Sequence, residues 1–256
     1  MVRPVPEEPD GEKATGSLDA DAAAVAGVKA PSSRVALDRQ RILDAAVAYV
    51  DEHGLARLTM RAVGGELRVE AMSLYRHVDG REGLLDGIVD TIIDETYDDP
   101  EVIVTPEHGW QDFLQRLAHG IRRVALRHPN AFPLVASRPP EAPWLRPPLR
   151  NLRWVESFFE GLAAEGFSDD VAVIAYRAFT SFLLGHLLLE VAARGADISP
   201  LDVLDTADEP DDALAAFPHV RRHRVALAED QSAVEFEESL EHLLERLALQ
   251  VAQSEG

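Results

Sequence analysis

The chain contains no cysteine, and it has no run of about 18 or more apolar residues. Without cysteine there can be no disulfide bond and no thiolate metal site, which fits a cytoplasmic protein. Without a long apolar run we expect no membrane-spanning helix. Residues 1–30 also lack the basic-then-apolar order of a secretory signal. We therefore expect a cytoplasmic protein with no membrane partner.

Motifs typical of enzymes are missing as well. There is no Gly-x-Ser-x-Gly element, and the one Gly-Gly pair, Gly64-Gly65, lies inside a predicted helix rather than in a phosphate-binding loop. His219 and His223 have the spacing of a helical metal pair, but they flank two arginines and no third ligand is evident. We expect no catalytic residue, no metal and no cofactor.

The sequence also lacks sustained alternation of apolar and polar residues, which is the pattern typical of β-strands. Apolar residues, 46% of the chain, recur instead at helical spacing, which predicts an all-α protein. The net charge of −20 is unevenly distributed, because residues 34–81 hold eight Lys or Arg against seven Asp or Glu. Phosphate binding requires local cations rather than a basic whole protein, so this acidic chain is compatible with DNA binding.

The segment Leu58–Val78 reads as a helix, a three-residue turn at residues 67–69 and a second helix of about two turns. Thr59 can cap the first helix. Four residues are predicted to face inward: Val63, Leu67, Leu74 and Val78. A further helix should start from Asp79, with Glu82 completing a pair that resembles a capping box. The pattern predicts a helix-turn-helix, whose second helix can enter the DNA major groove.

The motifs 58-LTMR-61, 72-MSLYRHV-78 and Leu84-Leu85 resemble the N-terminal domain of the tetracycline-repressor (TetR/AcrR) family over about residues 37–97. A weaker resemblance to the family's ligand-binding domain runs through 110-WQDFL-114, 137-SRP-139 and Gly185. Arg68 departs from the pattern, since family members usually have glycine in this turn. A left-handed backbone conformation there would be strained for arginine.

Several side chains are predicted to face DNA. Arg76 suits bidentate contact with guanine, Arg61 can reach a guanine or a phosphate, and Ala71 and Met72 offer apolar contact to thymine methyl groups. Tyr75, His77, Arg81 and Thr59 are placed to hold phosphate. The resemblance implies the same roles at Arg61, Met72, Ser73, Tyr75, Arg76 and Arg81. The alternative for any one of them is an ordinary solvated side chain. The complete candidate set is Thr59, Arg61, Ala71, Met72, Ser73, Tyr75, Arg76, His77 and Arg81.

Helices between Trp110 and Arg194 are expected to enclose an apolar ligand cavity. Its candidate lining is Phe113, Leu117, Ile121, Phe132, Val135, Trp144, Phe158, Phe179, Phe182 and His186. The alternative is that these residues form ordinary core. In tetracycline-binding relatives the positions matching Leu117, Ile121 and Val135 carry a polar, an aromatic and a metal-liganding side chain. Here all three are aliphatic, so the magnesium–tetracycline site is not expected. We expect a more apolar effector instead.

These patterns predict three regions: a disordered tail at residues 1–33, a helix-turn-helix domain at 34–97 and a ligand-binding and dimerisation domain at 98–256. Within the last, residues 129–148 hold seven prolines and should form a broken helix or loop. Residues 196–212 hold seven acidic and no basic residues, which predicts a solvated loop. Long helices are predicted at 149–166, 169–194 and 232–252.

A short recognition helix reads only a few base pairs, so specificity requires two copies on a palindrome. The resemblance implies that helices 169–194 and 232–252 pair as a four-helix bundle; the alternative is that both are core helices. We therefore expect a homodimeric, ligand-responsive repressor that binds double-stranded DNA and is released by a small molecule. The alternative is a helical small-molecule-binding protein or enzyme with a relic DNA-binding module.

Overall fold

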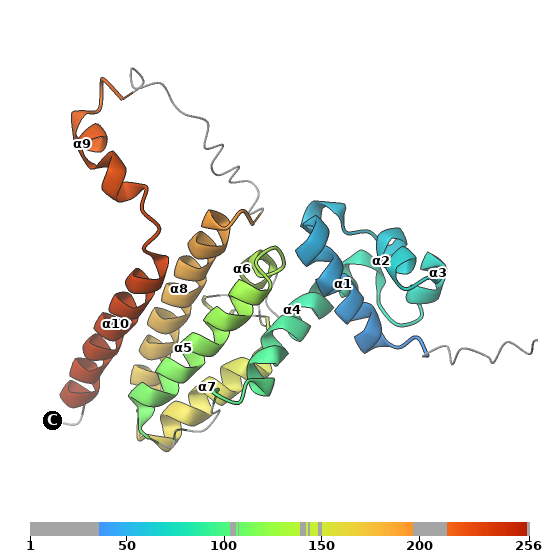
Figure 1. Cartoon of the computed structure of the whole chain (residues 1–256). Helices are drawn as coiled ribbons and strands as arrows, with labels where there is room; N and C mark the ends of the chain where they lie inside the picture. Colours follow the sequence, from blue (N-terminus) through green and yellow to red (C-terminus); the bar gives the residue numbers. More distant parts are fainter. Residues whose placement is uncertain are drawn as a thin grey trace, which may run out of the picture. The chain divides into compact units, whose positions relative to one another are not determined.

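The structure is a computed structural model that describes residues 36–102, 106, 108–138, 142, 144–147, 150–196 and 214–254. Throughout these residues the regular structure is helical, with no strand, as the sequence predicted (Figure 1). The expected tail at 1–33 lies outside the described residues, and so does the acidic loop beyond residue 196. The helices are α1 (Arg39–His53), η1 (Leu55–Arg57), α2 (Met60–Glu66), α3 (Ala71–Leu74), α4 (Gly80–Asp98), α5 (Trp110–Arg127), α6 (Pro133–Ser137), α7 (Leu152–Ala164), α8 (Asp169–Ala193), α9 (Pro218–Leu227) and α10 (Ser232–Ser254).

The helix-turn-helix is formed by α2 and α3. The Thr59 hydroxyl accepts a hydrogen bond from the Ala62 amide at 3.1 Å, so the predicted cap is present. Arg68 adopts a φ of 56° and is the only non-glycine residue with positive φ among the described residues, so the turn has a left-handed conformation at this position. Gly64 lets the two helices approach, because a Cβ there would lie 3.0 Å from the Val69 carbonyl oxygen. The backbone of this turn therefore places α3 tightly against α2.

Two local predictions about this region were wrong. The recognition helix is four residues long rather than about two turns, and Tyr75–His77 continue it as a turn, because the chain then bends through Gly80 (φ 66°) into α4. Asp79 makes no side-chain cap hydrogen bond. Its ψ of 66° is not that of an N-cap residue, which is normally extended, and Glu82 instead forms an ion pair with Arg138 at 2.8 Å.

Helix α4 joins the helix-turn-helix to the rest of the chain. Its apolar stripe is buried, and α4 packs on α1 and on α5. The buried members of that stripe are Leu84, Leu85, Ile88, Val89, Ile92 and Ile93. A single helix thus contributes to the core of both domains, and a movement of α4 in one domain must be felt in the other.

The larger domain is built on α5, which packs against α7 and α8, while α8 also packs against α7 and α10 (Figure 1). The proline-rich segment contains the five-residue α6, in agreement with a broken helix. Helix α8 is long and apolar enough to cross a membrane by length and composition, but its packing on three neighbours is that of a core helix. Helix α9 was not predicted, and none of its residues is buried.

Candidate nucleic-acid interface and ligand pocket

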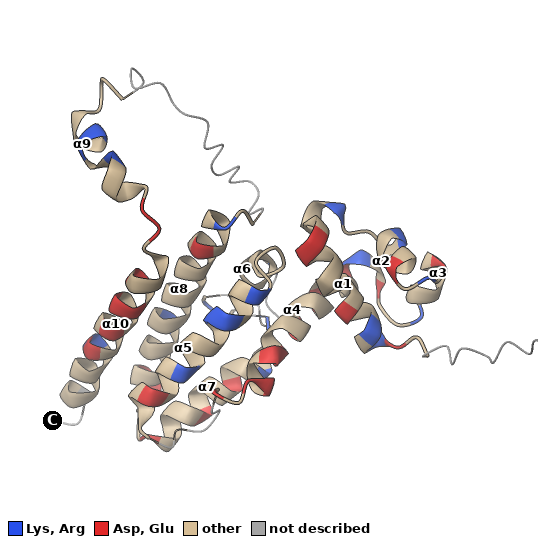
Figure 2. Cartoon of the chain, viewed as in Figure 1, with Lys and Arg blue, Asp and Glu red and all other residues tan. Residues whose placement is uncertain are grey.

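Three arginines mark the exposed surface of the helix-turn-helix. Arg61 lies in the first turn of α2, Arg76 in the turn after α3 and Arg81 in the first turn of α4, and all three side chains are exposed. Arg61 and Arg76 form no salt bridge with another described residue, and Arg81 only approaches Glu82 at 4.0 Å. Figure 2 shows basic residues on α1 and α2, with acidic residues among them. Cations without internal partners are free to bind phosphate or guanine.

Two buried residues hold the recognition segment in place. Leu74 is fully buried and Val78 is 4% exposed, so they fix the segment to the domain core. Met72, at 72% exposed, and Tyr75, at 50%, project from it. The remaining candidates Ala71, Ser73 and His77 are half-buried. The outer face that this segment offers to a groove is thus formed mainly by Met72, Tyr75 and Arg76, beside the exposed Thr59 of α2.

The larger domain has a closed interior. Phe113, Leu117 and Phe158 border a void of about 10 Å³, while Ile121 and Val135 border a second of about 20 Å³. Each void has room for about one water molecule, whereas a drug-sized ligand requires about 300 Å³ or more. Phe132 and Phe179 are fully buried in the same core. The candidates therefore come together, but around a packed core rather than an open pocket.

Trp154 borders both voids, although no sequence pattern singled it out. It is 3% exposed, and its indole Nε1–H has no hydrogen-bond partner among the residues that the structure describes. A buried donor without a partner is costly, typically by about 1–3 kcal/mol. The indole ring stacks on Phe158 with centroids 5.6 Å apart. This side chain therefore forms part of the wall of both voids, and its buried polar group is unused.

Three predicted lining residues lie elsewhere. Trp144 is 77% exposed and borders an open surface groove of about 430 Å³, because the segment before α7 lies across the outside of the helices. Phe182 and His186 lie where α8 meets α10: the Phe182 ring packs on Phe236, and His186 Nε2 is 3.1 Å from the Ser232 carbonyl oxygen. Helical spacing could not distinguish this junction from the interior, because both require apolar or aromatic side chains.

Acidic residues spaced four apart on α4 are paired with arginines that flank α6 and α7. Arg138, at the end of α6, binds Glu82 at 2.8 Å and Asp86 at 2.5 Å, and Arg150 binds Asp86 at 3.1 Å. Arg150 also approaches Asp90 at 3.9 Å. The side chains of both arginines are less than one-fifth exposed, so solvent screens these pairs only partly. The proline-rich segment is thereby linked to the helix that leads to the helix-turn-helix.

A helix-turn-helix that shares one long helix with a larger helical domain defines a class of two-domain DNA-binding regulators. Comparison with known proteins gives the family. Residues 42–88 match the model for bacterial regulatory proteins of the tetR family, and residues 104–251 match the tetracyclin repressor-like C-terminal domain. The chain therefore belongs to the tetR family and is a DNA-binding transcriptional regulator.

Individual relatives agree with this assignment. An HTH-type transcriptional regulator of Saccharopolyspora erythraea is 30% identical over 63% of this chain and 64% of its own length. The class D tetracycline repressor protein of Escherichia coli is 26% identical over 84% of this chain and 91% of its own. A crystal structure of a possible TetR family regulator from Streptomyces coelicolor has 26% identity and a TM-score of 0.65, covering 83% of this chain and 99% of its own.

Proposed function

We propose that this regulator is a cytoplasmic, non-enzymatic homodimer that represses transcription from a palindromic operator and is released by a small, largely apolar molecule. The observation that carries the proposal is the pairing of two features along one helix. At one end of α4 lies a helix-turn-helix with two exposed arginines, Arg61 and Arg76, that form no salt bridge with another described residue. At the other end lies an apolar interior with small voids and an unpaired indole donor.

In the proposed complex Arg76 reads a guanine and Arg61 reaches a neighbouring guanine or phosphate. Tyr75, His77, Arg81 and the Thr59 hydroxyl hold the phosphate backbone. Met72, Ala71 and Ser73 fill the groove between them. Met72 is 72% exposed, so its side chain is available for apolar contact with a thymine methyl group.

Dimerisation is proposed through α8 and α10. These two helices pack on each other, yet each keeps apolar residues in solvent: Ile174 and Leu189 on α8, at 43% and 70% exposed, and Leu249 on α10, at 56%. A second copy that places the same helices against these residues would bury them. A two-fold arrangement of this kind also positions two recognition segments for an inverted repeat.

Effector binding is proposed to occur around Trp154. The two voids are too small for a ligand, so the effector must displace the indole wall and join them, and its polar group would accept from the unused Nε1–H. Displacement would move α7 and the arginines beside it, Arg138 and Arg150, which are paired to α4. A ligand shifts the equilibrium this way only if it binds the released form more tightly; about 1.4 kcal/mol of coupling weakens operator binding tenfold.

The test is enrichment of bound duplexes from a random-sequence DNA pool with the full-length chain. We expect an inverted repeat to emerge, and we expect the double variant Arg61→Ala/Arg76→Ala to lose it. Arg222→Ala, which removes an exposed arginine from α9, is the matched control and should retain the repeat. If no sequence is enriched over non-specific binding, or if only a single half-site emerges, the proposal of a dimeric operator-binding repressor is wrong.

A further inference from the structure

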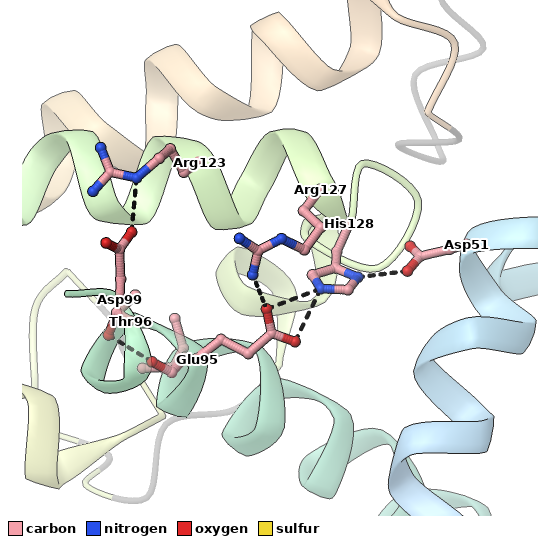
Figure 3. A network of polar contacts seen from close by, with 8 residues as sticks. Asp51, Glu95, Thr96, Asp99, Arg123, Arg127 and His128 are labelled. Atoms are coloured by element: carbon pink, nitrogen blue, oxygen red, sulfur yellow. Dashed lines mark hydrogen bonds and ion pairs between the residues drawn. The ribbon is translucent and has the colours of Figure 1, made fainter. Parts of the chain in front are cut away.

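His128 ends α5 and joins three helices through its ring (Figure 3). Nδ1 lies 2.5 Å from Asp51 Oδ2 on α1, while Nε2 lies 3.0 Å and 3.1 Å from the two carboxylate oxygens of Glu95 on α4. An ionised carboxylate can only accept hydrogen bonds. Both ring nitrogens must therefore donate, and only the protonated imidazolium has two N–H groups.

The surrounding charges favour that protonated form. Burial acts to lower the pKa of His128, but the hydrogen bond and charge of Asp51 and the charge of Glu95 outweigh it, so the pKa is raised above that of an ordinary histidine. The ring is only 12% exposed, so solvent screens these interactions weakly. Loss of the proton would leave one nitrogen lone pair facing a carboxylate.

Other charged groups around the ring belong to α4, α5 and the chain after α4. Arg127, the preceding residue on α5, also binds Glu95, at 2.7 Å, and Arg123 binds Asp99 and Glu101 at 2.7 Å and 3.0 Å. Asp98 lines an open surface cavity that His128, Glu95 and both arginines also line. On the side of α1, the Asn130 side chain donates to the Asp51 carbonyl oxygen at 2.9 Å. Neither of these arginines binds Asp51 through a described contact, so His128 is the cation that ties this carboxylate to α5.

We propose that His128 is a proton-dependent clasp that ties α1 of the helix-turn-helix domain to α4 and α5 of the ligand domain. With the proton bound, the end of α1 is held against the end of α5. When the proton leaves, only one ring nitrogen can donate, so the link between Asp51 and Glu95 is broken, and the end of α1 keeps the Asn130 hydrogen bond and its packing on α4. The pH would then determine how strongly the motions of the two domains are coupled.

The pH dependence of the stabilisation follows from the direction in which the pKa of His128 is shifted. Because the folded-state pKa of His128 is raised, the stabilisation is fully present below the pKa of a histidine in the unfolded chain. It is lost as pH rises through the folded-state pKa. The clasp is thus closed in acid and opens toward alkaline pH, and its effect is confined to the elements it joins.

The experiment follows the His128 ring resonances of the full chain by NMR between about pH 5.5 and 9. In parallel, amide hydrogen exchange measures the protection of the last turn of α1, corrected for the intrinsic pH dependence of exchange. We expect the protection to fall about tenfold as His128 deprotonates, the equivalent of one charge-assisted hydrogen bond. His128→Gln should show the high-pH level of protection at every pH. No DNA is required, so failure of this test is distinct from failure of the proposed function.

Two further variants complete the test. Asp51→Asn should lower the pKa of His128 and move the loss of protection to lower pH, which answers the question even if His128→Gln fails to fold. His108→Gln is the control, since His108 is exposed and its salt-bridge partner among the described residues is Asp112, at 3.9 Å. The clasp is refuted if the pKa of His128 is not raised above that of an ordinary histidine, or if the protection of α1 does not follow the titration of His128.

Discussion

The helix-turn-helix domain and the ligand domain present their candidate residues in opposite ways. In the first, Arg61, Tyr75 and Arg76 stand in solvent on short segments fixed by a few buried anchors such as Leu74. In the second, Phe158 and its neighbours are inside, in contact with one another. A polar residue on the outside of a helix is not needed for packing, so its functional role can be inferred from the sequence. An apolar residue inside has a structural duty whether or not it also binds a ligand.

The largest effect should come from the interior. Phe158 is fully buried and its ring lies within 6 Å of the rings of four others: Trp154, Phe159, Tyr176 and Phe179. Phe158→Ala should lower the free energy of unfolding by about 3–5 kcal/mol, because it removes the ring and leaves a cavity. Urea denaturation of the full chain measures this. Phe217→Ala, which truncates a phenylalanine that is 58% exposed, should change stability by no more than about 0.5 kcal/mol.

This pair of variants can break the comparison. If Phe158→Ala lowers the free energy of unfolding only slightly, the interior is not a packed core but already a loose ligand pocket. The contrast between the two domains then disappears. A cost in the expected range would instead show that the effector must displace packed side chains in order to bind.

The second effect is on the surface. Arg76→Ala should weaken operator binding by about 1–3 kcal/mol and relax the base preference at one position of each half-site, since guanine loses a bidentate partner. Arg81→Ala should weaken binding to all sequences alike and lower the salt slope by about one unit, as expected for a phosphate contact. Both are measured by fluorescence anisotropy over a series of duplexes and salt concentrations. Equal and sequence-independent losses would contradict the role of Arg76.

The same contrast explains what the sequence could predict. Apolar spacing is sufficient to predict helices α1, α2, α4, α5, α7, α8 and α10. The capping role of Thr59 can be predicted because this residue directly precedes an apolar helix. Asp79 was misassigned because a cap depends on the local ψ and on whether Glu82 has another partner. That partner, Arg138, lies 56 residues away in the chain.

Other features had no local signal at all. Helix α9 buries no residue, so it has no apolar stripe to detect. Trp154 and His128 are single residues whose importance comes from what surrounds them in three dimensions. His128 stands before a proline and marked only the end of a helix in the sequence, yet its two carboxylate partners lie 77 and 33 residues away. Tertiary contacts of this kind are set by packing and not by periodicity.

The smallest predicted effect concerns the turn that joins α2 to α3. Arg68 is exposed and has a φ of 56°, a conformation that glycine adopts at no steric cost. Arg68→Gly should therefore raise the free energy of unfolding by about 0.5–1 kcal/mol, a rise in melting temperature of about 1–4 °C for a chain of this size. Arg57→Gly is the control, since Arg57 is also exposed but its φ is not positive, and the added freedom of glycine in the unfolded chain should make that variant less stable. If Arg68→Gly melts at or below the temperature of the parent chain, the strain is offset by a contact of the arginine side chain. A loss of affinity for all DNA sequences in the same variant would show separately that Arg68 contacts phosphate in the complex.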